Sequence, residues 1–185
     1  MKALKNLLQK ELIMALGCTE PIAIALCCAR AGEEMTQEMK KINLHLSASV
    51  IKNANSVYVP NAKGRKGILI AAALGFVSHA SGLKLRVLQN ISDEDIRLAD
   101  EFIAQGRLKI IHEKDCEPVY IRAEIIGESD VVNCIVEGGH ENLCYLEKNG
   151  RVLFDTRHKK DILSDSDTFK IDIDDIFNYA RTVDF

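Results

Sequence analysis

The stretch Val119-Tyr-Ile-Arg-Ala-Glu-Ile-Ile126, Gly127-Glu-Ser-Asp130, Val131-Val-Asn-Cys-Ile-Val136 establishes the fold class. Two short runs rich in β-branched residues flank a polar connection that contains glycine, a pattern typical of consecutive strands. Three more short strands are predicted from the same residue types, at 107–111, 143–147 and 152–154. Between the last two lies Asn149-Gly150, a strong signal for a two-residue hairpin. The second half of the chain therefore predicts a largely antiparallel sheet.

Helices are predicted mainly in the first half. The leucines between Leu4 and Leu16 recur at helical spacing and predict an amphipathic helix that ends at Gly17. Pro21 is favoured at the first position of a helix, and the nearly all-apolar run that follows it to Gly32 predicts a second, buried helix. Further helices are predicted at 68–79, 92–105 and 173–179.

Strands also occur among these helices. From Lys41 to Leu46 apolar residues alternate with polar ones, which predicts a strand with one buried face. Shorter strands are predicted at 57–59 and 85–88, and an asparagine-rich connection precedes the first of them. The combination is typical of an α+β fold, with helices packed on a mixed, largely antiparallel sheet.

Composition narrows the classes of function. The chain has 185 residues, 47% of them hydrophobic and 28% charged, with a net charge of −3. This profile is that of a soluble globular protein, and the absence of a basic field argues against a nucleic-acid partner. No signal-peptide core is seen, and the longest apolar runs, 22–29 and 68–77, are too short for a membrane span. We therefore expect a cytoplasmic protein with no membrane partner, whose six cysteines are free thiols.

The run Gly17-Cys18-Thr19-Glu20-Pro21 is the strongest chemical signal. Unpaired N–H groups at the start of a helix stabilise a thiolate, so Cys18 could act as a base or nucleophile. Glu20 would favour the helix dipole but would oppose the thiolate if the carboxylate came close. The alternative, a purely structural role, is that Cys18 is a small buried residue in a tight turn. Residue chemistry leaves these readings open.

The block Ala15-Leu-Gly-Cys-Thr-Glu-Pro21 resembles the signature of the L-cysteine desulfidases, a branch of the iron-sulfur-dependent serine dehydratase-like proteins. Further blocks resemble the family in the same order: Lys52-Asn53, Val59-Pro60, Gly67 with Ile70–Gly75, and Gly138-Gly139-His140-Glu141-Asn142. The chain departs from the family after Pro60, where Asn61-Ala-Lys-Gly64 replaces a glycine-rich turn. Because family members are longer, the resemblance implies that residues 1–185 are an amino-terminal domain without the cluster-binding domain.

The resemblance implies an enzyme of amino-acid catabolism, a lyase that converts L-cysteine, or L-serine, into pyruvate, ammonia and sulfide or water. Cys18 would accept the α-proton, and a 4Fe-4S cluster in the full-length enzyme would act as Lewis acid on the leaving group. The residues expected to bind the substrate are Lys52, Asn53, Gly138, Gly139 and His140.

No metal ligands are expected in this chain. Cys27 and Cys28 are adjacent on a helix and point about 100° apart, so they would not readily hold one cluster together. The expected partner is a cluster-bearing carboxyl-terminal domain or subunit. The sequence leaves open whether the chain also forms a homo-oligomer. Two alternatives remain: a non-catalytic amino-acid-binding regulatory domain, and a scaffold whose apolar helices dock the other half.

Overall fold

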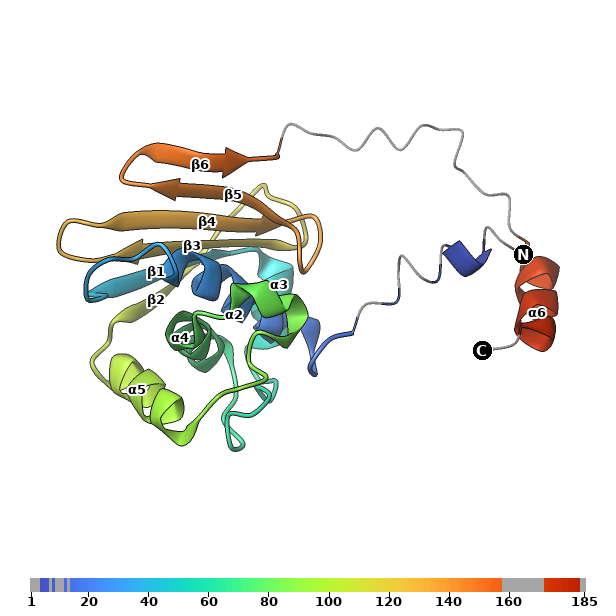
Figure 1. The fold of residues 1–185 in the computed structure, drawn as a ribbon, viewed down its shortest axis with the longest axis horizontal. Helices are drawn as coiled ribbons and strands as arrows, with labels where there is room; N and C mark the ends of the chain where they lie inside the picture. The colour runs from blue at the N-terminus through green and yellow to red at the C-terminus, as the bar shows by residue number, and fades with distance from the viewer. Residues whose placement is uncertain (1–3, 7, 9–11, 13, 158–171, 184–185) are drawn as a thin grey trace. The chain divides into compact units, whose positions relative to one another are not determined.

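Six strands form one mixed sheet in the order β2-β1-β3-β4-β5-β6 (Figure 1). Strands β1 and β2 are parallel, and every other neighbouring pair is antiparallel. The α+β prediction is therefore confirmed. The strand bounds are β1 Lys41–Leu46, β2 Leu108–His112, β3 Tyr120–Ile126, β4 Val131–Glu137, β5 Leu143–Lys148 and β6 Arg151–Asp155.

This computed structural model describes residues 4–6, 8, 12, 14–157 and 172–183. The chain divides into two units, Ala15–His158 and Met1–Met14 with Lys159–Phe185. The first unit contains the sheet and every residue considered below as part of a site. Of the second, the described part includes helix α6 (Ile173–Thr182), where a terminal helix is predicted and where Asp172 caps the first turn.

The hairpin between β5 and β6 follows from its turn residues. Asn149 and Gly150 both have positive φ, at 52° and 79°, as the favoured two-residue hairpin turn requires. The Asn149 side chain also accepts a hydrogen bond from the backbone N–H of Val131 at 2.7 Å. The predicted hairpin is therefore confirmed, and its turn residue also contacts the start of β4.

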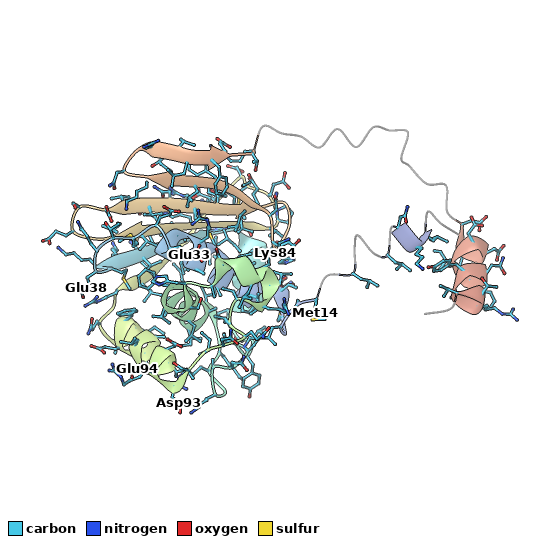
Figure 2. The ribbon with its side chains drawn as sticks, viewed as in Figure 1. Met14, Glu33, Glu38, Lys84, Asp93 and Glu94 are labelled. Carbon is cyan, nitrogen blue, oxygen red and sulfur yellow. The ribbon has the colours of Figure 1, made fainter. Side chains whose placement is uncertain are left out.

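The helices pack in succession onto one face of the sheet. Helix α2 (Thr19–Gly32) contacts β3 and β4, α4 (Ile68–Ser78) packs on α2, and α5 (Asp93–Ala104) packs on α4 (Figure 1). Ser92 caps α5 in a capping box with Asp95, and Asp93 and Glu94 lie in its acidic first turn (Figure 2). Gly75 permits the close approach of α4 to α2, because a Cβ there would overlap the backbone oxygen of Ala25.

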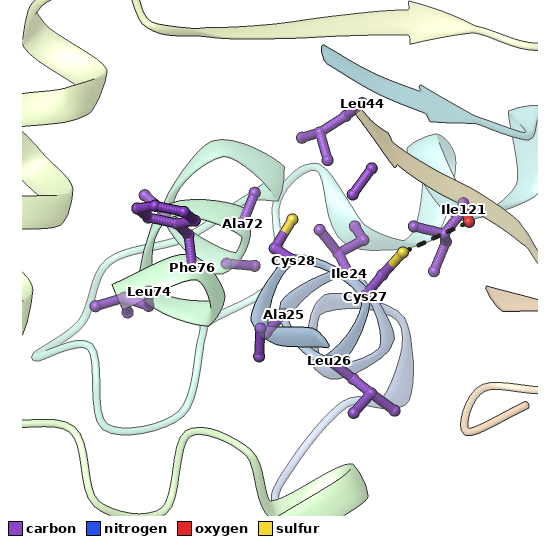
Figure 3. Close-up of a cluster of buried hydrophobic side chains, with 14 of the residues drawn as sticks. Ile24, Ala25, Leu26, Cys27, Cys28, Leu44, Ala72, Leu74, Phe76 and Ile121 are labelled. Atoms are coloured by element: carbon purple, nitrogen blue, oxygen red, sulfur yellow. Dashed lines mark hydrogen bonds between the residues drawn. The ribbon is translucent and has the colours of Figure 1, made fainter. Parts of the chain in front are cut away.

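Helix α2 is the centre of the hydrophobic core. All its residues from Pro21 to Gly32 except Arg30 are buried, as its apolar sequence predicts. Its cysteines face different neighbours: Cys27 donates a hydrogen bond from Sγ to the backbone oxygens of Cys134 at 3.2 Å and Ile121 at 3.7 Å, whereas Cys28 lies toward α4 (Figure 3). All six cysteines of the chain are free thiols, as expected.

Four local predictions need correction. Helix α2 begins at Thr19, not Pro21, which occupies the third helical position, where its missing N–H has no helical partner in any case. The helix predicted to reach Leu16 does not, because Leu16 donates its N–H to the backbone oxygen of Leu85, and part of that predicted helix lies outside the described residues. Residues 57–59 form only the single bridge Tyr58–Lys66.

A strand is also predicted at 85–88, and this prediction is wrong. The chain forms the 3-10 helix η1 (Ser81–Arg86) there, followed by a turn. A further helix, α3 (Ala48–Ala54), occupies the asparagine-rich connection after β1 and is capped by Ser47. None of the helices in the described ranges combines the length and apolarity needed to cross a lipid bilayer.

Candidate functional site

Three segments that are distant in sequence converge at the start of α2. Cys18 is the residue that precedes the first turn of α2, and Glu20 lies within that turn. Asn53 comes from α3, and His140 from the turn that follows β4. The side chains of Cys18, Asn53 and His140 meet at the carboxylate of Glu20.

The Glu20 carboxylate accepts hydrogen bonds on both oxygens. On Oε2 the donors are the Cys18 thiol and the Thr19 hydroxyl, each at 3.3 Å. On Oε1 the donor is the Asn53 side-chain amide, at 2.9 Å. His140 Nε2 lies 3.7 Å from the same Oε1, which is an electrostatic contact rather than a hydrogen bond.

Burial and hydrogen bonding act on Glu20 in opposite directions. Burial raises the pKa of this carboxyl group, since only 17% of the side chain is exposed. The hydrogen bonds from Asn53, from its own backbone N–H and from Cys18 outweigh that effect and hold the pKa below its ordinary value. Glu20 is therefore ionised at neutral pH.

Cys18 is a protonated thiol in this arrangement. Burial raises its pKa, and the hydrogen bond to the Glu20 carboxylate raises it further. The backbone N–H groups of Glu20 and Thr19 lower it, as expected at the start of a helix, but they are outweighed. Of the two effects left open by the sequence, the carboxylate therefore prevails over the helix start.

The turn after β4 holds His140 opposite Glu20. Gly138 has a φ of 75° and donates its N–H to Val119, while the backbone oxygen of Gly139 accepts from Asn142. His140 Nε2 and Glu141 Oε2 are buried atoms without a hydrogen-bond partner among the described residues. Glu141 Oε1 lies 3.5 Å from Nζ of Lys84, which is labelled in Figure 2. Two buried polar atoms of this turn thus retain unused hydrogen-bonding capacity.

The structure brings together Cys18, Asn53 and His140 of the residues predicted from sequence. Lys52, by contrast, is exposed on α3 and makes no ion pair with any described residue. Gly138 and Gly139 shape the turn that carries His140. The sequence did not predict that Glu20 is the residue that the other side chains of the site contact. Its position two residues after Cys18 was a signal for this role.

The cysteines of the described chain do not fit a metal cluster. Cys27, Cys28 and Cys134 are fully buried in the core, and the Cys27 thiol is hydrogen-bonded to backbone oxygens. Within the described ranges, no three His, Cys, Asp or Glu side chains are grouped so that they could hold an ion. These cysteines are therefore packing residues of the core.

Fold and site together define an α+β domain with a thiol, a carboxylate, an amide and an imidazole at the start of its central helix. The chain is similar to UPF0597 proteins. It is 36% identical over 180 residues to one from Clostridium perfringens, covering 96% of this chain and 42% of that protein. It is 37% identical over 187 residues to one from Finegoldia magna, covering 100% of this chain and 44% of that protein.

A UPF0597 protein from Bacteroides thetaiotaomicron is 32% identical over 182 residues, covering 98% of this chain. The chain thus spans less than half the length of these relatives, at 42%, 44% and 42%. No family model matches the chain. No solved structure matches it either.

Proposed function

We propose that this chain carries the proton-abstracting part of an amino-acid lyase, with Cys18 as the proton acceptor. One observation supports this most: Cys18, Asn53 and His140, from three separate segments, meet around Glu20. Thiol, carboxylate and imidazole are the groups that exchange protons in enzymes. The choice of an amino-acid lyase rests on the resemblance of residues 15–21 and 138–142 to the L-cysteine desulfidases.

The proposed reaction is a β-elimination from L-cysteine, or from L-serine. The Cys18 thiolate takes the α-proton, the Cα–H electrons form a Cα=Cβ double bond, and the bond from Cβ to sulfur or oxygen breaks. The leaving group departs as hydrosulfide or hydroxide. The aminoacrylate that remains tautomerises to an imine, which water hydrolyses to pyruvate and ammonia.

Cys18 has to lose its own proton before it can accept another, and the Glu20 carboxylate opposes this loss. Activation therefore requires a change in the surroundings of Glu20 when the substrate binds. His140 lies on the opposite side of the Glu20 carboxylate and has an unpaired nitrogen with which to contact the substrate or to relay a proton.

The 4Fe-4S cluster would be bound by another part of the enzyme. In the family that the chain resembles, a 4Fe-4S cluster supplies a Lewis acid for the leaving group. The partner that we propose is accordingly a carboxyl-terminal domain or subunit with the cluster ligands. A cytoplasmic location accords with six free thiols, since reducing conditions preserve them.

The raised pKa of Cys18 favours a second candidate function, a non-catalytic domain that binds an amino acid and regulates a partner. A thiol that stays protonated is a hydrogen-bond donor and not a base. In that case L-cysteine or L-serine would bind to this chain alone and binding would be lost in His140→Ala, which isothermal calorimetry measures.

The test of the lyase proposal combines this chain with the polypeptide that supplies the remaining length of its relatives. After anaerobic reconstitution with iron and sulfide, pyruvate formation from L-cysteine and L-serine is followed. We expect Cys18→Ser to lower the rate at least about a hundredfold, the usual contribution of a positioned base. Cys116→Ser is the matched control. Cys116 is also a half-buried thiol with a pKa raised by burial, and it is not one of the residues around Glu20. Equal pyruvate formation by Cys18→Ser and wild type would refute the proposal.

A further inference from the structure

The Glu20 carboxylate lacks a permanent cationic partner. Among the described residues no lysine or arginine lies within ion-pair distance of it, although only 17% of its side chain is exposed. Its donors are a thiol, a hydroxyl and an amide, and the imidazole of His140 remains 3.7 Å away. A largely buried carboxylate is normally paired with a full positive charge.

A second polar atom without a hydrogen-bond partner lies beside Glu20 Oε1. His140 Nε2 is buried, faces this oxygen and has no hydrogen-bond partner among the described residues. In the tautomer that carries its proton on Nδ1, Nε2 is an acceptor. Two acceptors then face each other, and a group with several donors and a positive charge can bond to both.

We propose that Glu20 and His140 bind the α-ammonium group of an amino acid, and that this binding releases the Cys18 thiol to ionise. The inference rests on the proposed function for the identity of the ligand as an amino acid. An ammonium has three N–H donors and no acceptor, so it satisfies Glu20 Oε1 and His140 Nε2 together. Its charge offsets the carboxylate charge, which together with burial holds the proton on Cys18.

This arrangement couples activation to the substrate. Without a ligand, the thiol stays mostly protonated and reacts with oxidants and electrophiles more slowly than a free cysteine. With an α-ammonium in place, the nearest negative charge is neutralised and the thiolate forms beside the α-carbon. The site therefore selects molecules with a free α-ammonium, and rejects α-hydroxy acids and N-acylated amino acids of the same shape.

The experiment measures thiolate absorbance at 240 nm against pH in the whole chain, with Cys18→Ser as the background to be subtracted. L-serine is the ligand, and L-glycerate, in which a hydroxyl replaces the ammonium, is the matched analogue. We expect L-serine to increase the Cys18 thiolate fraction at neutral pH by about tenfold, equivalent to a shift of one pH unit, and L-glycerate to have no effect.

Two variants test the role of Glu20. Glu20→Gln should increase the thiolate fraction without any ligand, weaken L-serine binding and abolish the effect of L-serine; Glu20→Asp should preserve that effect. Glu113→Gln is the matched control, since Glu113 opposes the thiolate of Cys116 and does not contact Glu20. The thiolate fraction of Cys18 should not change in this variant.

The inference is overturned if L-serine gives no heat of binding with this chain, if it binds without changing the Cys18 absorbance, or if Glu20→Gln binds it as tightly as the wild type. These measurements involve no turnover. A combined enzyme that forms no pyruvate would refute the lyase proposal alone, whereas pyruvate formation without a ligand-dependent thiolate would refute the coupling alone.

Discussion

Gly17 lies against the ring of Pro60 so closely that a Cβ at position 17 would be 2.8 Å from Pro60 Cγ. Gly17 also has a φ of 79°, a conformation that residues with a Cβ rarely adopt. The residue immediately before Cys18 is thus fixed twice, by its backbone conformation and by the loop that contains Pro60.

Gly17→Ala should therefore both destabilise the protein and displace Cys18. We expect a loss of about 2–3 kcal/mol in the free energy of unfolding, from the left-handed backbone and from the clash with Pro60. Urea unfolding measures the loss, and the rate of Cys18 alkylation reports the displacement. Gly64→Ala is the control: its φ is 82°, but nothing lies within 4 Å of a Cβ there. It should cost about 1 kcal/mol and leave Cys18 unchanged.

A second glycine controls the packing of the two central helices. Gly75→Ala should reduce the free energy of unfolding by about 3 kcal/mol, because the added methyl overlaps the Ala25 backbone and forces α4 away from α2. Thermal and urea unfolding measure this loss. Gly82→Ala provides the comparison, since it is exposed and a Cβ there meets nothing within 4 Å. If the two substitutions proved equally harmless, the close contact between α2 and α4 would be wrong.

Asp130 should make stability depend on pH at the acid end. Its carboxylate accepts hydrogen bonds from the Thr36 hydroxyl at 2.6 Å and the Thr36 N–H at 2.9 Å, and lies 3.3 Å from Lys148 Nζ. These contacts hold the pKa of Asp130 well below its ordinary value. The stabilisation is therefore complete above the unfolded-state pKa of about 3.9 and is lost as the pH falls toward the lower pKa of the folded state.

Asp130→Asn should then be less stable than the wild type at pH 7, and the difference should shrink below about pH 4 as the wild-type carboxylate is protonated. Urea unfolding at a series of pH values measures it. Glu128→Gln is a suitable control, because this carboxylate makes only an exposed contact with Lys40. A stability difference for Asp130→Asn that persisted unchanged to pH 2 would contradict the assignment.

The six thiols should fall into two reactivity groups. Burial raises the pKa of Cys28, and it raises the pKa of Cys144 to about 11. The pKa of Cys134 is raised by a hydrogen bond with Cys27 and by burial. In native protein at pH 8, iodoacetamide should modify only Cys18 and Cys116, each more slowly than a free cysteine because their pKa values are raised. Peptide mass spectrometry with and without urea measures this; rapid native modification of Cys28 would refute the packing of α2.

Much of the sheet could be predicted because its signals are local. Strands β3 to β6 follow one another in sequence, and each turn between them carries glycine or asparagine. Residues 85–88 were misassigned because Leu85-Arg-Val-Leu88 is too short a run for its period to separate a strand from other buried structure. Helix α3 was missed because its seven residues are too few to show a helical period, although Ser47 was a signal for its start.

The site could be predicted only in part. Its residues were singled out in separate blocks, and the sequence gives no distance between Cys18, Asn53 and His140. The contact between Asn53 and Glu20 spans 33 residues and depends on how α3 packs beside α2. The raised pKa of Cys18 comes from its burial and from the hydrogen bond to Glu20, and no sequence pattern specifies either.

Helix α2, which carries Cys18 and Glu20, is also the most deeply buried helix described here. The hydrogen-bonded amides of α2 should exchange with solvent only when the whole unit unfolds, whereas the turn that bears His140, flanked by the exposed residues Gly138 and Asn142, should open locally. Motion at the site is then one-sided. The thiol and the carboxylate should stay fixed with the core, whereas the His140 turn should move on the faster timescale of surface loops.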